Sequence, residues 1–279
     1  MQALNTAAAG RAQPVARGLR AARAIIGREV AKFLRQPARL ASALVRPLLW
    51  LVVFAAGFSN VFGVSIIPPY ETYIDYRVYV LPGLLGMVAL FNGMQSSLSL
   101  VYDREMGLMR LLLTAPLPRG WVLTFKLLAG ATLSLLQMLA FLAVARLLGL
   151  ELALQHAPLL LGAMAAAALL MAALGLALSV HVRQLENFAG AMNFVIFPMF
   201  FISSALYPLW KFEEAGAWWL YQLALLNPFT QVVEAMRFAA YGQWHTSGWV
   251  TAVVGTALAL ALAIHGYDPQ RGWAHQRGG

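Results

Sequence analysis

Six long apolar segments, separated by shorter polar ones, dominate the pattern along this chain. Each approaches or exceeds the roughly 17 to 25 residues that an α-helix needs to cross a lipid bilayer. They cover residues 44–62, 80–101, 122–148, 158–180, 188–206 and 248–264. The pattern therefore predicts an all-α polytopic membrane protein with six transmembrane helices.

Residues 15–36, before the first apolar segment, have a different pattern. Apolar side chains recur at helical spacing on one side, and Arg and Lys side chains lie roughly opposite. A basic amphipathic helix of this kind lies in the membrane interface, with its cations among anionic headgroups. We expect it to be retained in the mature chain. It serves either as a surface anchor alone or as a helix that also touches a cytoplasmic partner.

A charged segment, YDREMGLMRLLLTAPLPRGW, occupies residues 102–121 between the second and third apolar segments. If Asp103 begins a helix, its carboxylate lies at the electropositive N-terminus, and Pro116 ends the helix about three turns later. The leucines then spread over a wide apolar arc, with Glu105 near its middle. We therefore predict one short helix at the membrane surface.

An aromatic segment of mixed charge, residues 207–247, precedes the last apolar segment. Because Trp and Tyr favour the headgroup level, we expect interfacial helices that dip into the edge of the membrane. Within the segment, Asn227 and Pro228 predict a helix start, with Asn at the N-cap and Pro at the first helical position.

The basic residues are distributed unevenly between the two sides of the membrane. With the N-terminus in the cytoplasm, 16 of the 20 Lys and Arg residues fall on the cytoplasmic side. The positive-inside rule then places both termini and segment 102–121 in the cytoplasm, and segment 207–247 outside. We expect a cytoplasmic tail and amphipathic helix over residues 1–43, a six-span domain over 44–266, and a second cytoplasmic tail over 267–279.

Composition agrees with a membrane protein, since 61% of the residues are hydrophobic and 11% are charged, against about 25% charged in soluble chains. The net charge of +9 does not indicate nucleic-acid binding, which would need a basic patch on a soluble domain. The chain has no cysteine, and its five histidines lie far apart. We therefore expect neither a metal site nor a nucleic-acid partner.

Catalytic groups are also missing from the pattern. The sequence contains no G-x-x-x-x-G-K-[ST] phosphate loop, so we expect no ATP site in this chain. Arg46 is expected to snorkel at the start of the first span, and no charged residue is expected in the middle of any span. Ion-coupled carriers usually need such groups. The sequence thus predicts no catalytic site and favours a passive pathway driven by another protein.

Two spans carry small or polar residues at helical spacing. In the second span, Asn92, Gln95, Ser96 and Ser99 share a face that should contact protein or water rather than lipid. In the fourth span, Gly175 and Ser179 have the spacing of a close helix contact.

Two motifs resemble the membrane-spanning subunits of type 2 ABC (ATP-binding cassette) exporters. They are DREMGLMRLLLTAPLPR, residues 103–119, and LNPFTQVVEAMR, residues 226–237. Together with the basic N-terminal helix, the resemblance covers nearly the whole chain. Many relatives have Thr and an acidic residue after the glycine where this chain has Leu108 and Arg110.

The resemblance implies a permease subunit that works as a homodimer, or beside a similar subunit, with two separate ATPase subunits that bind ATP and Mg²⁺. This chain would then bind no cofactor itself, and the helix within 102–121 would be the coupling helix that docks on the ATPase. The docking residues would be Asp103, Arg104, Glu105, Gly107, Leu108, Arg110, Leu111 and Leu112. Glu105 would pair with the partner or only favour its own helix.

By the same resemblance, the first and fifth spans would form the dimer contact, and the second and fifth would line the path. Candidate path residues are Asn92, Gln95, Ser96, Ser99, Asn193, Phe197 and Phe201. Aromatic residues in a span can equally serve packing alone. The implied protein exports an amphipathic or lipid-linked substrate across a bacterial inner membrane. The alternative is a membrane scaffold that recruits a soluble partner through segment 102–121 without transport.

Overall fold

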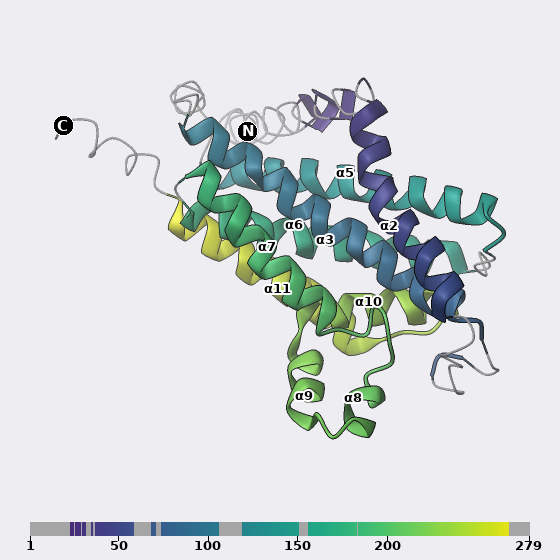
Figure 1. Ribbon diagram of the computed structural model, residues 1–279. Helices are drawn as coiled ribbons and strands as arrows, with labels where there is room; N and C mark the ends of the chain where they lie inside the picture. The colour runs from purple at the N-terminus through teal and green to yellow at the C-terminus, as the bar shows by residue number, and fades with distance from the viewer. Residues whose placement is uncertain are drawn as a thin grey trace, which may run out of the picture.

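Figure 1 shows a computed structural model of the protein. The structure describes residues 23–24, 26–28, 30–31, 35, 37–58, 68–70, 74–105, 119–150, 156–182 and 184–267. Within these residues, nine helices are assigned from α2 to α11. Five long helices are α2 (Pro37–Phe58), α3 (Tyr76–Glu105), α5 (Arg119–Leu147), α6 (Ala157–His181) and α11 (Thr246–Gly266). The shorter ones are α7 (Leu185–Phe201), α8 (Trp210–Glu214), α9 (Trp218–Leu226) and α10 (Pro228–Ala240). This architecture confirms the predicted all-α fold.

The centre of the bundle is the contact between α3 and α6. A Cβ added to Gly93 of α3 would stand 2.6 Å from the backbone carbonyl carbon of Met171, and one added to Gly175 of α6 would stand 2.6 Å from the carbonyl oxygen of Gly93. No side chain fits at such distances, so the two backbones approach directly, as small residues allow between membrane helices. The predicted close contact at Gly175 and Ser179 is confirmed, and Ser179 is fully buried.

Four described helices are long and apolar enough to cross a membrane, namely α3, α5, α6 and α11. The last of them has 21 residues, longer than the 17-residue segment expected from sequence, because polar residues extend it at both ends. In α2 the apolar part is Leu44–Val53, and α7 has only 17 residues. The chain is thus a multi-pass membrane protein, with four spans shown by length and composition.

Two boundaries differ from the sequence prediction. Helix α3 continues through Asp103 to Glu105, so Asp103 does not begin a separate helix and its carboxylate is not at a helix N-terminus. Helix α7 ends at Phe201 rather than at Leu206. Pro198 lies in its last turn, and the carbonyl oxygens of Met199 and Ile202 at this end of α7 accept hydrogen bonds from Asn227, as described below.

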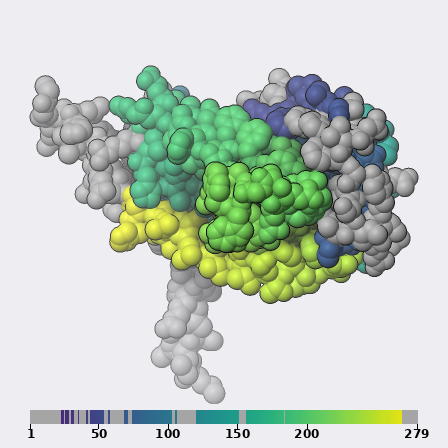
Figure 2. Space-filling model, turned by 60° about the horizontal axis from the view of Figure 1, so that its bottom comes forward, coloured from purple at the N-terminus to yellow at the C-terminus, as the bar shows by residue number. Residues whose placement is uncertain are grey.

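The aromatic segment divides into two parts of opposite character. Helices α8 and α9 project from the bundle in Figure 1 and stand on its surface in Figure 2, and Trp218 and Trp219 are exposed. Helix α10 is instead packed among α3, α6 and α11, with nine of its 13 residues buried. The interfacial position of α10 stays a prediction, but its buried side chains contact other helices rather than headgroups. The expected helix start is confirmed, since the Asn227 side chain accepts a hydrogen bond from the Phe229 amide and Pro228 is the first helical residue.

Several predictions lie outside the described residues. The coupling positions Gly107, Leu108, Arg110, Leu111 and Leu112 belong to this group, as do the C-terminal tail after Tyr267 and all but scattered positions of the N-terminal helix. Asp103 and Arg104 are described only through their place in α3.

Candidate functional site

Helices α3 and α7 bring together most of the residues predicted to line a path. On α3, Gln95 and Ser99 are exposed, and on α7, Asn193, Phe197 and Phe201 are exposed. The two helices meet where the ring centroids of Phe91 and Phe197 lie 6.5 Å apart. We call the set Phe91, Gln95, Ser99, Asn193, Phe197 and Phe201 the path face.

The remaining two predicted path residues turn toward α5 instead. Asn92 is buried, and its Nδ2 donates a hydrogen bond of 2.9 Å to Ser134 Oγ. Ser96 is half-buried against α5, where a Cβ on Gly130 would stand 2.6 Å from the Ser96 Oγ. Positions 92 and 96 share one side of α3, and positions 95 and 99 share the adjacent side. The polar stripe is thus split between helix packing and the path face.

The path face changes in character along its length. The end of α3 meets the start of α7, because the Glu105 Oε1 accepts a hydrogen bond of 2.8 Å from the Leu185 amide. The polar members Gln95, Ser99 and Asn193 lie nearer this end. The aromatic members lie toward the other end, where Trp50 of α2 joins them with its ring 6.0 Å from that of Phe201.

A cation lies where the polar and aromatic parts of the path face meet. The guanidinium carbon of Arg46 is 3.9 Å from the centroid of the Phe91 ring, well within the range of a cation–π interaction. Phe91 lies halfway along the 30 residues of α3. Because α2 begins at Pro37, Arg46 lies about 14 Å inside that helix. It is nevertheless the third residue of the apolar part of α2, Leu44–Val53, so its predicted place near the start of the span stays a prediction.

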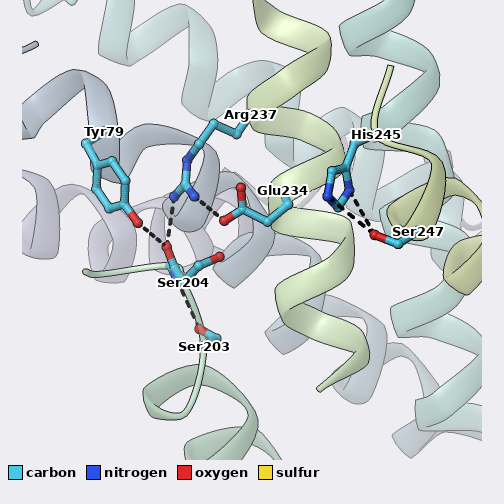
Figure 3. A network of polar contacts seen from close by, with 8 residues as sticks. Tyr79, Ser203, Ser204, Glu234, Arg237, His245 and Ser247 are labelled. Carbon is cyan, nitrogen blue, oxygen red and sulfur yellow. Dashed lines mark hydrogen bonds and ion pairs between the residues drawn. The ribbon is translucent and has the colours of Figure 1, made fainter. Parts of the chain in front are cut away.

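A second buried polar network, shown in Figure 3, was not predicted. Arg237 of α10 is 2% exposed and forms an ion pair with Glu234 one turn earlier. Its Nη2 donates a hydrogen bond of 2.8 Å to the Ser204 carbonyl oxygen, and its guanidinium carbon lies 4.1 Å from the Tyr79 ring centroid. The Tyr79 hydroxyl donates to the same carbonyl at 3.1 Å. Burial alone would lower the pKa of Arg237, but Glu234 and the neighbouring tyrosines outweigh burial and raise it, so the guanidinium stays charged.

This network continues along the turn after α7. Asn227 Nδ2 donates to the carbonyl oxygens of Met199 at 2.7 Å and Ile202 at 2.6 Å. The Tyr76 hydroxyl donates to the Leu206 carbonyl oxygen at 2.8 Å. A helix end leaves carbonyl groups without intrahelical partners. Asn227 supplies donors at the end of α7, and Tyr76 and Tyr79 of α3 supply donors to the turn that follows. The sequence signal was present, since Glu234 and Arg237 have the i,i+3 spacing of an ion pair. This spacing did not lead to the prediction of a network, because the whole segment 207–247 was assigned to the membrane interface.

Glu105 has a role that was not considered from sequence. Its side chain is exposed, yet it accepts the hydrogen bond from the first residue of α7. A carboxylate at a helix N-terminus stabilises the helix by roughly 0.3 to 1 kcal/mol. Glu105 therefore joins the end of α3 to α7.

Among the described side chains, no group of three or more His, Asp or Glu residues could hold a metal ion. The path face offers amide, hydroxyl and aromatic groups, with one guanidinium group beside them. Such a surface can bind and pass an amphipathic molecule, but it contains no pair of groups arranged for acid–base or nucleophilic catalysis.

The chain is similar to known transport proteins of membranes. Residues 20–241 match the family model described as ABC-2 type transporter. The protein named "Putative transport permease ycf38" from Pyropia yezoensis is 28% identical over 258 residues, which are 87% of this chain and 84% of that protein. Proteins of the same name from Cyanophora paradoxa and Porphyra purpurea are each 30% identical, over 75% and 77% of this chain and 71% and 72% of their own length. The chain therefore belongs to the ABC-2 type transporter family of membrane permeases.

Proposed function

We propose that this chain is the permease subunit of an ATP-driven exporter that moves an amphipathic or lipid-linked substrate outward. Membership of the ABC-2 type transporter family supports the transport role. The observation that carries the proposal further is the path face, whose polar part and aromatic part follow one another along α3 and α7. An amphipathic molecule has the same two kinds of surface, so it can remain in contact with matching groups as it moves.

The proposal includes a second permease subunit, either a copy of this chain or a similar one. Phe194 on α7 is 81% exposed, and Gly190 one turn away has no atom near the position of a Cβ. On α2, Leu49 and Val53 are also exposed. Small and apolar residues on one side of a helix favour close contact with another membrane helix. Helices α2 and α7 of both subunits would thus enclose the two path faces.

Two ATPase subunits would bind ATP and Mg²⁺ and dock on the helix within 102–121. The proposal places six spans in a bacterial inner membrane, with both termini cytoplasmic. The excess of Lys and Arg residues that this orientation gives to the cytoplasmic side supports it. Helices α8 and α9 would lie at the outer surface, where Trp218 and Trp219 reach the headgroup level.

Docking is tested by co-purification with an ABC ATPase, which is first sought in the reading frames next to that of this chain. Leu112→Asp places a charge on the apolar side of the coupling helix, and we expect it to abolish co-purification while membrane insertion is unchanged. Glu105→Gln is the matched variant, because the amide oxygen can still accept the hydrogen bond of the Leu185 amide. A loss of docking in Glu105→Gln would assign Glu105 to the partner as well.

Transport separates this proposal from a scaffold that only recruits a soluble protein. In proteoliposomes that contain both subunits, an exporter stimulates ATP hydrolysis when its substrate is added, whereas a scaffold does not. Unchanged co-purification of Leu112→Asp, together with ATP hydrolysis that no lipid extract stimulates, would contradict the proposed function.

A further inference from the structure

Arg46 places a positive charge level with the middle of a helix that is long and apolar enough to cross a membrane. Its guanidinium group lies over Phe91, halfway along α3, and α3 is one of the helices long enough to cross the membrane. Charged residues at such depth in membrane proteins face a partner, a cavity or a pathway rather than lipid. We therefore expect a negatively charged group to lie beside Arg46 when the protein works.

The described part of the protein does not supply that counter-charge. None of the ion pairs among the described residues includes Arg46. In the four spanning helices together with α2 and α7, the acidic residues are Asp103, Glu105 and Glu186, all in terminal turns. A second copy of the chain would bring the same helices, and so no carboxylate at the depth of Phe91.

The surroundings of Arg46 suit one end of an amphipathic molecule. Phe91 covers one side of the guanidinium group, and the side chain of Arg46 is otherwise exposed. Gln95, one turn further along α3, is exposed on the same side and offers an amide donor. Toward the opposite end, Phe197 and Phe201 stack with ring centroids 6.2 Å apart, which provides an apolar surface.

We propose that Arg46, held over Phe91, binds the anionic group of the transported molecule, so the substrate is an amphipath that carries a phosphate, sulfate or carboxylate. Gln95 donates a further hydrogen bond to that group, and the aromatic part of the path face contacts the apolar chain. Arg is suited to this role, since its planar group can stack on a ring and still present N–H donors at its edge. This inference rests on the proposed export function, and it names the chemical class of the substrate.

The test is a binding measurement with two fluorescent probes that share one acyl chain. One is a lysophosphatidic acid, which carries a phosphate monoester, and the other is the uncharged monoacylglycerol. The full-length chain in dodecyl maltoside is titrated with each probe, and fluorescence anisotropy gives the dissociation constants. We expect the wild type to bind the anionic probe about tenfold more tightly, the factor expected from one charged hydrogen bond. A fluorescent fatty acid distinguishes carboxylate from phosphate.

Four variants make the measurement specific. Arg46→Gln should remove the preference for the anionic probe, and Arg46→Lys should keep part of it. Phe91→Leu should weaken binding of the anionic probe about threefold, because it removes the ring that holds the guanidinium group. Arg77→Gln is the control for net charge, since Arg77 is exposed beside Asp75 at the start of α3, and it should leave the preference unchanged.

Equal binding of both probes by the wild type would overturn the inference. A preserved preference in Arg46→Gln, or an equal loss in Arg77→Gln, would do the same. If Arg46→Gln fails to fold, Phe91→Leu and Arg46→Lys still decide the outcome. The measurement needs no ATPase, so its result is independent of the docking and transport experiments that test the proposed function.

Discussion

Two arginines in this membrane domain occupy environments of opposite kind. Arg237 is 2% exposed, paired with Glu234 and hydrogen-bonded to the Ser204 carbonyl oxygen. Arg46 is exposed along the path face, stacked on Phe91, and has no carboxylate beside it among the described residues. The residue type is the same, but the charge of Arg237 is neutralised by Glu234 within the protein, whereas the charge of Arg46 is available to bind an anionic group.

The difference assigns the two arginines to different tasks. A buried cation with its own carboxylate joins elements, and Arg237 joins α10 to the turn after α7 and to α3. A cation without an internal partner is stabilised only when something binds it. We therefore expect substitutions of the first to affect stability and substitutions of the second to affect binding.

The largest effect on stability is expected for Arg237→Met. Removal of the buried partner leaves the partly buried Glu234 without its counter-charge, which costs up to about 3 kcal/mol. The apparent Tm of the protein in dodecyl maltoside should fall sharply, and less folded protein should be recovered. The double variant Arg237→Met with Glu234→Leu should recover part of the loss. A single variant that melts like the wild type would show that the pair does not hold α10 in place.

A smaller loss is expected for Asn227→Ala, which removes the N-cap of α10 and both donors to the last carbonyl groups of α7. We expect a cost of about 2 kcal/mol. Asn227→Asp is the matched variant, because its carboxylate keeps the N-cap but cannot donate to the carbonyl groups. Thermal melting should place Asn227→Asp between the wild type and Asn227→Ala, and an equal loss in both would assign the whole effect to the donors.

Acid should weaken the same region, though less than either substitution. Burial lowers the pKa of His245. Glu234 raises this pKa and Arg237 lowers it, and the net direction remains downward. The neutral ring accepts the hydrogen bond of the Gly248 amide at the start of α11. Its contribution is complete above the unfolded pKa of about 6.5 and is lost as the pH falls through the folded value.

The check on this pH dependence compares apparent Tm values at pH 7.5 and pH 5. His245→Asn keeps an N-cap acceptor that does not titrate, so it should lose less stability on acidification than the wild type. An identical pH dependence in both proteins would remove His245 from the explanation and point to another titrating group.

The smallest change in stability is expected for Arg46→Gln. Because Arg46 is exposed and makes no ion pair with a described residue, its substitution should alter the free energy of unfolding by no more than about 0.5 kcal/mol. Apparent Tm values of this variant and the wild type should coincide, while the Arg237→Met variant melts far lower. A large loss in Arg46→Gln would show that Arg46 has a structural role like that of Arg237.

Much of the helix pattern could be predicted because it depends on local sequence. The apolar runs located α3, α5, α6 and α11, and the Asn227-Pro228 start of α10 was correct. The boundaries at Asp103 and after Phe201 were wrong, since α3 continues past its apolar run and α7 is ended by donors from distant residues. The path residues stay a prediction: Gln95, Ser99, Asn193, Phe197 and Phe201 are exposed, whereas Asn92 packs against α5.

By itself, the sequence determined the class of protein, its helices and its family motifs, because the length and polarity of a segment are properties of consecutive residues. Only the tertiary structure decided which polar groups meet. It placed the Arg46 guanidinium group over Phe91, 45 positions later in the chain, and the Arg237 guanidinium group beside the Ser204 carbonyl oxygen. In a membrane, where water cannot pair buried polar groups, such contacts between distant residues decide whether a charge is structural or available for binding.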